Sequence, residues 1–232
     1  MTHFSLRLAD LRSRISTACQ EFGRNPEEIT LLAVSKRHPA EAIREAVAAG
    51  QHYVGENFVQ EAIDKMDQTR DLDLIWHFIG HLQSNKTRLV AERFQWVQSL
   101  DRARIARRLD AQRPFHAPPL DVCIQVCLES EPGKGGVMPA GLADLATEIA
   151  GLDRLRLRGL MAIPPPSDDF EIQRGYFRHL REMRDELVAG GLQLDTLSMG
   201  MSADLEAAVA EGATLLRIGT ALFGPRPGTG AE

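Results

Sequence analysis

The sequence predicts a single (β/α)8 barrel of the TIM type, α/β in class, with one extra helix at its N-terminus. Three observations support this prediction. Eight short apolar runs of strand length alternate with helical patterns, no linker rich in Pro, Gly or Ser divides the chain, and 232 residues is an ordinary length for one such barrel. A doubly wound open sheet is the alternative, but no G-x-G-x-x-G follows a predicted strand. We expect one domain over residues 1–232, with the extra helix at 1–23 and the barrel at 29–224.

The elements of the first half follow from hydrophobic spacing and from the residues that end each run. Apolar residues three and four positions apart, from Phe4 to Phe22, predict an N-terminal helix that ends at Gly23. The run Ile29–Lys36 predicts the first strand, because a parallel strand buried on both faces need not alternate, and Pro39 is placed to open the next helix. Three further strands, each with a helix after it, are predicted at Tyr53–Val54, Leu74–Gly80 and Gln95–Leu100, the last followed by Asp101 as an N-cap.

The second half repeats the same alternation. Strands are predicted at Leu120–Leu128, Leu155–Ile163, Leu194–Gly200 and Thr214–Gly219. Pro139 is placed to open the helix after the fifth strand, and a long helix through Tyr176 and Leu187 follows the sixth. The helix after the seventh strand is expected over Met201–Glu211, with Ser202 as its N-cap. Eight strands separated by helices close most economically as a barrel, whose functional residues gather where the strands end.

Composition is that of an ordinary globular protein, with 44% hydrophobic and 25% charged residues. The formal net charge of −5 argues against a general affinity for nucleic acid or anionic membranes. The sequence has neither a signal-peptide core nor an apolar run long enough to span a bilayer. We therefore expect a cytoplasmic monomer with no nucleic acid and no membrane among its partners. Cys19, Cys123 and Cys127 fit reduced core thiols better than a disulfide framework.

Lys36 is the first candidate site residue. It closes a buried apolar strand, and the carboxyl ends of parallel strands are where α/β proteins build their sites. Other strand ends should surround the same cavity, at Glu56-Asn57, His77 to Gly80, Met161, Ser198 to Ser202 and Arg217 to Thr220. His77 and His81 lack the register and third ligand of a zinc site, so we expect no metal.

The last two of these strand ends suggest a phosphate site. Gly200 lets the backbone approach a ligand, and the helix after Ser202 offers free N–H groups and the positive end of its dipole. The other segment adds the amides of Gly219 and Thr220, the Thr220 hydroxyl and the guanidinium of Arg217. Asp204 lies in the first turn of the same helix, so its side chain must face away from an anion. A primary amine opposite a phosphate cradle suggests a phosphate-bearing aldehyde, of which pyridoxal 5′-phosphate is an example.

The sequence also resembles a known family, the pyridoxal phosphate homeostasis proteins. The resemblance covers nearly the whole chain through L-L-A-V-S-K, V-G-E-N, Ile75 to Gly80, L-Q-S-N-K, R-G-L-M-A-I-P, L-S-M-G-M-S and R-I-G-T-A-L-F-G. It implies the barrel of the alanine racemases without their second, all-β domain. Small departures are Arg37-His38 after the lysine, Phe58 after G-E-N and the loop Gly133–Gly136.

This resemblance also implies roles for individual residues. Lys36 resembles the Schiff-base lysine, Ser202, Gly219 and Thr220 look like phosphate contacts, and Arg217 looks like the neighbour of the pyridine nitrogen. Asn57 and Met161 complete the expected cofactor-binding set, with Met161 under the cofactor ring. No residue is assigned a catalytic role.

Two classes of function are compatible with these residues. The first is a carrier and regulator that holds pyridoxal phosphate and passes it to apo-enzymes, with free amino acids as further partners. The second is an enzyme, either an amino-acid racemase or a Schiff-base aldolase on the same barrel. A guanidinium at the ring nitrogen makes a weak electron sink, neither Tyr53 nor Tyr176 ends a predicted strand, and Glu56 is the only obvious carboxylate for an aldolase. We therefore expect no enzymatic turnover.

Overall fold

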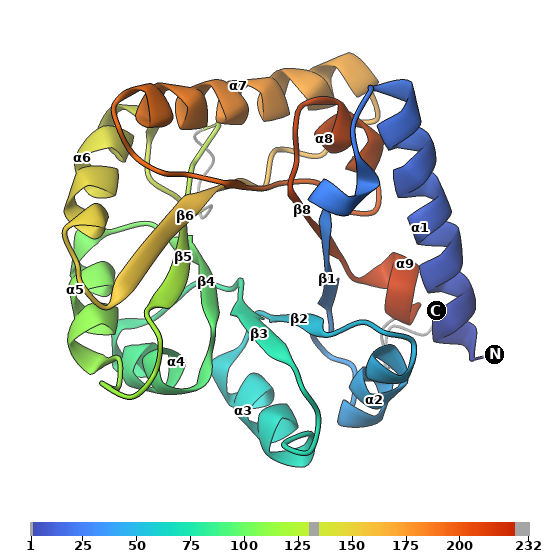
Figure 1. The fold of residues 1–232 in the computed structure, drawn as a ribbon, viewed down its shortest axis with the longest axis horizontal. Coiled ribbons are helices and arrows are strands. Elements are labelled where there is room, and N and C mark those ends of the chain that lie inside the picture. The colour runs from blue at the N-terminus through green and yellow to red at the C-terminus, as the bar shows by residue number, and fades with distance from the viewer. Residues whose placement is uncertain (1, 130–134, 226–232) are drawn as a thin grey trace, which may run out of the picture.

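The barrel predicted from the sequence is confirmed by the structure, a computed structural model that describes residues 2–129 and 135–225. Eight parallel strands follow one another in chain order around a closed barrel (Figure 1). They are β1 (Thr30–Val34), β2 (Tyr53–Glu56), β3 (Ile75–Phe78), β4 (Trp96–Leu100), β5 (Leu120–Gln125), β6 (Leu155–Met161), β7 (Thr196–Ser198) and β8 (Leu215–Ile218). The barrel closes where β1 pairs with β8, from Thr30 opposite Leu215 to Ala33 opposite Ile218.

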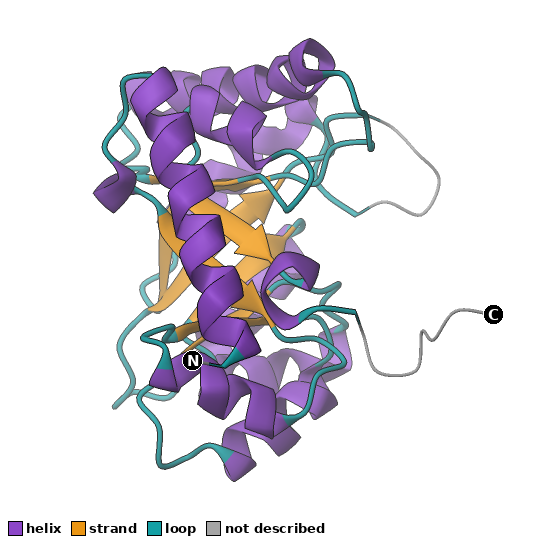
Figure 2. Cartoon of the chain, turned by 90° about the vertical axis from the view of Figure 1, so that its right-hand side faces the viewer, coloured by secondary structure: helices purple, strands orange, loops and turns teal. Residues whose placement is uncertain are grey.

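Helices surround this barrel on its outside (Figures 1 and 2). They are α1 (His3–Glu21), α2 (Ala40–Ala48), α3 (Val59–Gln68), α4 (Thr87–Arg93), α5 (Ala103–Gln112), α6 (Pro139–Ala150), α7 (Phe170–Ala189), α8 (Leu205–Ala210) and α9 (Thr220–Phe223), with short 3-10 helices at Pro26–Glu28 and Ser84–Lys86. The extra helix α1 runs along the outside and packs against α8 and α9. Its predicted apolar stripe, from Phe4 through Leu11 to Ala18, is buried.

The hydrophobic core lies mainly between the strands and the helices, where Phe78 packs edge-on against Phe94 at 5.6 Å between ring centroids. All three cysteines are buried and unpaired, as predicted. Residues 2–129 and 135–225 form no sheet besides the barrel. Among these same residues, no helix is both long and apolar enough to cross a bilayer.

Several predicted element ends are wrong. β1 ends at Val34, so Lys36 lies in the turn after the strand instead of closing it. Helix α8 begins at Leu205 with Asp204 as its N-cap residue, so Ser202 is not the N-cap. Asp101 is not an N-cap either, because Arg102 takes that position before α5. Pro39 is the N-cap residue of α2 and not its first helical residue. Backbone hydrogen bonding therefore shortens these elements relative to their hydrophobic patterns.

Candidate functional site

A cavity of about 280 Å³ lies at the carboxyl ends of the strands, which we call the C-terminal mouth of the barrel. Its volume is near the lower end of the roughly 300–1,000 Å³ typical of small-molecule sites. Six of the seven residues predicted to bind a cofactor line this cavity, namely Lys36, Asn57, Ser202, Arg217, Gly219 and Thr220. Segments far apart in the sequence therefore meet at one place, as barrel topology requires.

Met161 is the exception. Its side chain is fully buried and does not line the cavity. Ile163, two residues later and beyond the end of β6, lines it instead. Among the other lining residues, Ile79 and Met201 lie within two of the predicted strand-end segments, whereas His38 lies outside all of them. His38 stacks on Phe223 of α9 at 5.0 Å, so this side of the cavity is held by a contact between the first and last parts of the barrel.

Lys36 is carried by a tight turn. The backbone N–H of His38 donates to the Ser35 carbonyl oxygen at 2.9 Å, and Arg37, the third residue of this turn, has φ of 64°. A positive φ at this position favours Gly or Asn, and arginine adopts it at an energetic cost. Arg37 is the only described residue other than glycine with a positive φ. Backbone strain of this kind collects at functional sites, and here it lies beside the candidate lysine.

Arg217 starts a buried chain of hydrogen bonds inside the barrel. Its guanidinium donates to Ser198 Oγ at 2.7 Å and to the Ala162 carbonyl oxygen at 2.8 Å. Ser198 Oγ donates to Gln98 Oε1 at 2.6 Å, and Gln98 Nε2 lies 2.8 Å from His77 Nδ1. Because arginine can only donate, every donor in this chain points away from Arg217, and His77 carries its proton on Nε2.

This chain has definite charges. Burial lowers the pKa of Arg217 to about 10 and the pKa of His77 to about 3. Near neutral pH Arg217 is therefore charged and His77 is neutral. His77 was expected at the cavity, but the structure directs it down the barrel interior, away from the C-terminal mouth. Its Nε2 is buried without a hydrogen-bond partner in the part of the chain that is described.

Two short segments that follow β7 and β8 form another part of the cavity wall. Ser202 lies in the turn before α8, and Gly219 is the N-cap residue of α9, whose first residue is Thr220. The first amides of a helix have no partner inside the helix, so those of α9 remain available to an acceptor. A Cβ on Gly219 would stand 3.4 Å from the Val34 carbonyl oxygen, which keeps this wall narrow. Asp204 accepts a hydrogen bond from the Met201 amide at 2.5 Å, so its carboxylate is used by its own turn.

Glu56 does not line this cavity, against the expectation from its strand end. It is fully buried behind the barrel wall, where its Oε1 accepts hydrogen bonds from Ser35 Oγ at 2.5 Å and from Lys65 Nζ of α3 at 2.6 Å. Side chains of neighbouring strand residues point to opposite faces, so Glu56 faces the helices while Asn57 faces the cavity. This arrangement removes the carboxylate on which an aldolase reaction would depend.

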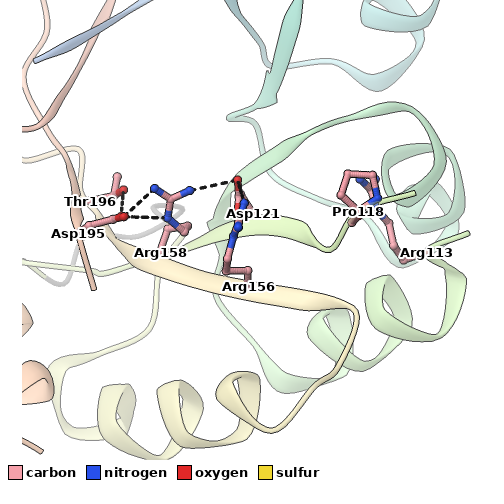
Figure 3. Close-up of polar contacts among 7 residues, drawn as sticks. All are labelled: Arg113, Pro118, Asp121, Arg156, Arg158, Asp195 and Thr196. Carbon is pink, nitrogen blue, oxygen red and sulfur yellow. Dashed lines mark hydrogen bonds and ion pairs between the residues drawn. The ribbon is translucent and has the colours of Figure 1, made fainter. Parts of the chain in front are cut away.

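A second cavity, of about 560 Å³, lies at the opposite end of the strands, which we call the N-terminal mouth. Arg158 lines this cavity and forms ion pairs with Asp121 at 3.2 Å and with Asp195 at 2.6 Å (Figure 3). The Arg158 guanidinium also lies 4.9 Å from the centre of the Trp96 ring. Tyr53 lines this cavity and is therefore at the wrong end of the barrel to act beside Lys36.

The remaining candidates lie elsewhere. Tyr176 is on α7 and donates to Glu129 at 2.6 Å. His81 accepts from Arg102 at 3.2 Å outside the cavity. Lys134, in the Gly133–Gly136 loop, lies outside the described residues. Within residues 2–129 and 135–225, no three His, Cys, Asp or Glu side chains are grouped so that they could hold a metal ion.

Comparisons with a family model and with known proteins agree on the family to which this chain is similar. The model of the alanine racemase N-terminal domain matches residues 6–227. The chain is 54% identical over 226 residues to the pyridoxal phosphate homeostasis protein of Pseudomonas aeruginosa, with 97% of each chain covered. It is 52% identical to the protein of the same name from Escherichia coli K12, covering 97% of this chain and 98% of the relative.

Solved structures agree with these relatives. PipY of Synechococcus elongatus with PLP bound superposes with a TM-score of 0.86 at 43% identity, covering 96% of this chain and all of PipY. An alanine racemase from Clostridium difficile superposes with a TM-score of 0.72 at 14% identity. That match covers 95% of this chain but 58% of the racemase, and at such identity it supports the fold alone.

Proposed function

This chain belongs to the pyridoxal phosphate homeostasis proteins, within the alanine racemase N-terminal domain family, and we propose that it holds pyridoxal 5′-phosphate as a Schiff base with Lys36 and acts as an intracellular carrier and regulator of that cofactor. One observation carries the proposal: Lys36 lines the same small cavity as Arg217 and the Gly219-Thr220 segment. The PLP-bound structure of PipY supports it from a relative. In this proposal apo-enzymes receive the cofactor, amino acids compete for it, and the working unit is a monomer.

The lining residues suit each part of pyridoxal phosphate. The Lys36 nitrogen adds to the aldehyde carbon and one water molecule leaves, which forms the Schiff base. Ser202, Gly219 and Thr220 offer hydroxyl and amide donors to the phosphate. Asn57 Oδ1 is buried and has no hydrogen-bond partner in the described chain, so it offers an acceptor to the ring hydroxyl. Met161 is left with a packing role beneath the cavity.

The same residues are poorly suited to turnover. When bound, pyridoxal phosphate supplies an electron sink that is strongest when its ring nitrogen is protonated. Arg217 cannot accept that proton, because a guanidinium only donates, so the ring stays neutral in the proposed arrangement. Racemisation also requires an acid or base on the face opposite Lys36. Tyr53 and Glu56, which could have served, lie outside the cavity. These placements favour a carrier over a racemase or an aldolase.

The visible spectrum of the purified protein tests the proposal. Added pyridoxal phosphate should give a visible absorption band that borohydride abolishes, and peptide mapping should find the reduced adduct on Lys36. Pyridoxal without phosphate should bind poorly, because it cannot use the Ser202, Gly219 and Thr220 donors. Mapping of the adduct to Lys65 or Lys86, or equal affinity for the two aldehydes, would contradict the proposed site.

A further inference from the structure

We propose that Lys65, together with Glu56 and Glu61, is a positioning residue that sets the conformation of the Lys36 turn and so directs the Lys36 amine into the cavity. We call these three residues the clasp. The inference deepens the proposed function and rests on it, because it concerns the same lysine. None of the three lines the cavity, so their effect on a ligand must pass through the turn.

Within the clasp, the Lys65 ammonium makes three hydrogen bonds, one to the turn and two to the other clasp residues. Lys65 Nζ donates to the Ser35 carbonyl oxygen at 2.8 Å, to Glu56 Oε1 at 2.6 Å and to Glu61 Oε1 at 2.7 Å. All three N–H bonds of the ammonium are therefore used. The Ser35 carbonyl is the acceptor that closes the turn, since the His38 amide also donates to it at 2.9 Å. Lys65 thus holds the first residue of the turn that carries Lys36.

The other end of the turn is held by Glu61. Its Oε1 accepts a hydrogen bond from the backbone N–H of Arg37 at 2.5 Å. Arg37 is the residue with φ of 64°, a conformation that an arginine does not keep without support from its surroundings. A single oxygen of Glu61 therefore joins the strained amide to the Lys65 ammonium. Lys36 lies between two anchored residues.

Burial of the clasp argues that it does more than stabilise the fold. The Glu56 side chain is fully buried and the Lys65 side chain is 7% exposed. Removing two charges from water is costly, and well-packed apolar side chains in such places often stabilise a fold equally well. Ser35 and Lys36 point to opposite faces of the barrel wall, so the clasp acts on the helix side while the amine faces the cavity. The clasp fixes geometry without occupying the space that a ligand needs.

The test separates the position of the amine from the shape of the cavity. Lys65→Met removes the ammonium and retains similar bulk. Lys86→Met is the matched control, because Lys86 has no contact with the turn among the described residues. Both proteins would be titrated with pyridoxine 5′-phosphate, which has an alcohol in place of the aldehyde and cannot react with an amine. Both would then be mixed with pyridoxal phosphate, and the growth of the visible band and the borohydride-trapped adduct on Lys36 would be followed.

Lys65→Met should bind pyridoxine 5′-phosphate within about twofold of the parent but form the adduct at least about tenfold more slowly. Lys86→Met should match the parent in both. Glu61→Ala removes the contacts to Arg37 and to Lys65 but keeps the buried pair of Lys65 and Glu56, and its carboxylate is partly exposed, so it decides the question if Lys65→Met does not fold. Slower adduct formation in Glu61→Ala should be partly reversed by adding Arg37→Gly, because glycine adopts positive φ freely.

Adduct formation at the parent rate in folded Lys65→Met and Glu61→Ala would overturn the inference. If instead the parent itself yields no adduct on Lys36, the proposed function fails, whatever the variants do.

Discussion

The two mouths of the barrel both carry charged side chains, but they use them differently. At the N-terminal mouth the charges satisfy one another, because Arg156 and Arg158 both pair with Asp121, and Arg158 also pairs with Asp195 (Figure 3). At the C-terminal mouth Arg217 makes no ion pair with a carboxylate in the described chain, and its guanidinium donates to neutral oxygens instead. The first arrangement balances its own charges, whereas in the described chain the second leaves the Arg217 charge without a carboxylate bonded to it.

This difference separates residues that stabilise the barrel from residues that bind. Barrels place their active sites at the C-terminal face, while the opposite face serves stability. Changes at the C-terminal mouth should therefore alter cofactor binding with little change in the free energy of unfolding. Changes at the N-terminal mouth should do the reverse. The chain of hydrogen bonds from Arg217 to His77 runs between the two mouths. Substitutions in this chain therefore test whether binding and stability are separate.

The largest effect is expected at Lys36. Lys36→Ala should abolish the visible band of the loaded protein, because no other amine lines the cavity in the described chain. The free energy of unfolding should change by less than about 1 kcal/mol, since the side chain is not part of the packed core. Absorbance before and after borohydride, with chemical denaturation, measures both quantities. Lys86→Ala is the control, and a Lys36→Ala protein that still carries reducible cofactor would contradict the site.

A large pH effect on stability is expected from His77. Its folded pKa is about 3 and its ordinary value is 6.5, so its neutral form is favoured by folding. The stabilisation is fully present above pH 6.5 and is lost as pH falls from there toward pH 3. At about pH 4 the loss relative to about pH 7.5 should be about 3 kcal/mol. His77→Gln should remove this part of the pH dependence in denaturant titrations. An unchanged pH dependence would show that His77 is not buried neutral.

The residues proposed to hold the phosphate should give intermediate effects. Ser202→Ala and Thr220→Val each remove one hydroxyl donor to a charged group, so each should weaken retention of pyridoxal phosphate by roughly 1.5 to 3 kcal/mol, or about tenfold or more. Dialysis of the loaded proteins, with fluorescence of the released cofactor as the readout, would measure the loss. The same substitutions should leave affinity for phosphate-free pyridoxal unchanged. A parallel loss for both aldehydes would mean that these residues shape the cavity and do not hold the phosphate.

The smallest effect is expected at the N-terminal mouth. Burial raises the pKa of Asp195, but hydrogen bonds from Arg158 and Thr196 outweigh burial and hold the pKa below its usual range. The ion pair is partly exposed, so Asp195→Asn should lower the free energy of unfolding by less than about 1 kcal/mol. Cofactor affinity should remain that of the parent. A clear loss of cofactor affinity would mean that the two mouths are coupled through the barrel.

The fold and most of the site follow from the sequence because strand-end residues are read from local patterns. Lys36 and Thr220 each follow an apolar run and Arg217 lies near the end of one, and barrel closure then brings them together. Met161 was misplaced because a hydrophobic pattern does not reveal which residue near a strand end turns toward the cavity. Ser202 was predicted to be the N-cap because its hydroxyl suits that role. In the structure Asp204 takes the N-cap position, and its carboxylate accepts a hydrogen bond from the Met201 amide.

The clasp as a whole could not be predicted. Glu61 and Lys65 stand four residues apart on α3, a spacing that suits a helical ion pair, but no local pattern connects them to Glu56 or to the Ser35 carbonyl. Glu56 was expected in the cavity because it ends a strand beside Asn57, and its partner Lys65 looks like an ordinary helix lysine. Only the packing of α3 on the barrel wall brings Lys65 to the Ser35 carbonyl. Contacts between residues of different elements leave no periodic signal in a sequence, so the bonds from Lys65 to Glu56 and to the Ser35 carbonyl are found from the structure alone.

The central claim is that Lys36 and Arg217 form a site that holds the cofactor and does not turn it over. Incubating the loaded protein with L-alanine in heavy water, and following α-deuterium and D-alanine, tests that claim most directly. An amino acid can displace Lys36, because this exchange requires only an entering amine, so the visible spectrum should shift slowly. Neither α-deuterium nor D-alanine should accumulate, since Arg217 would make the bound cofactor a weak electron sink and neither Tyr53 nor Glu56 lines the cavity. Turnover at ordinary enzyme rates, on the order of one per second or faster, would contradict the account and establish a racemase.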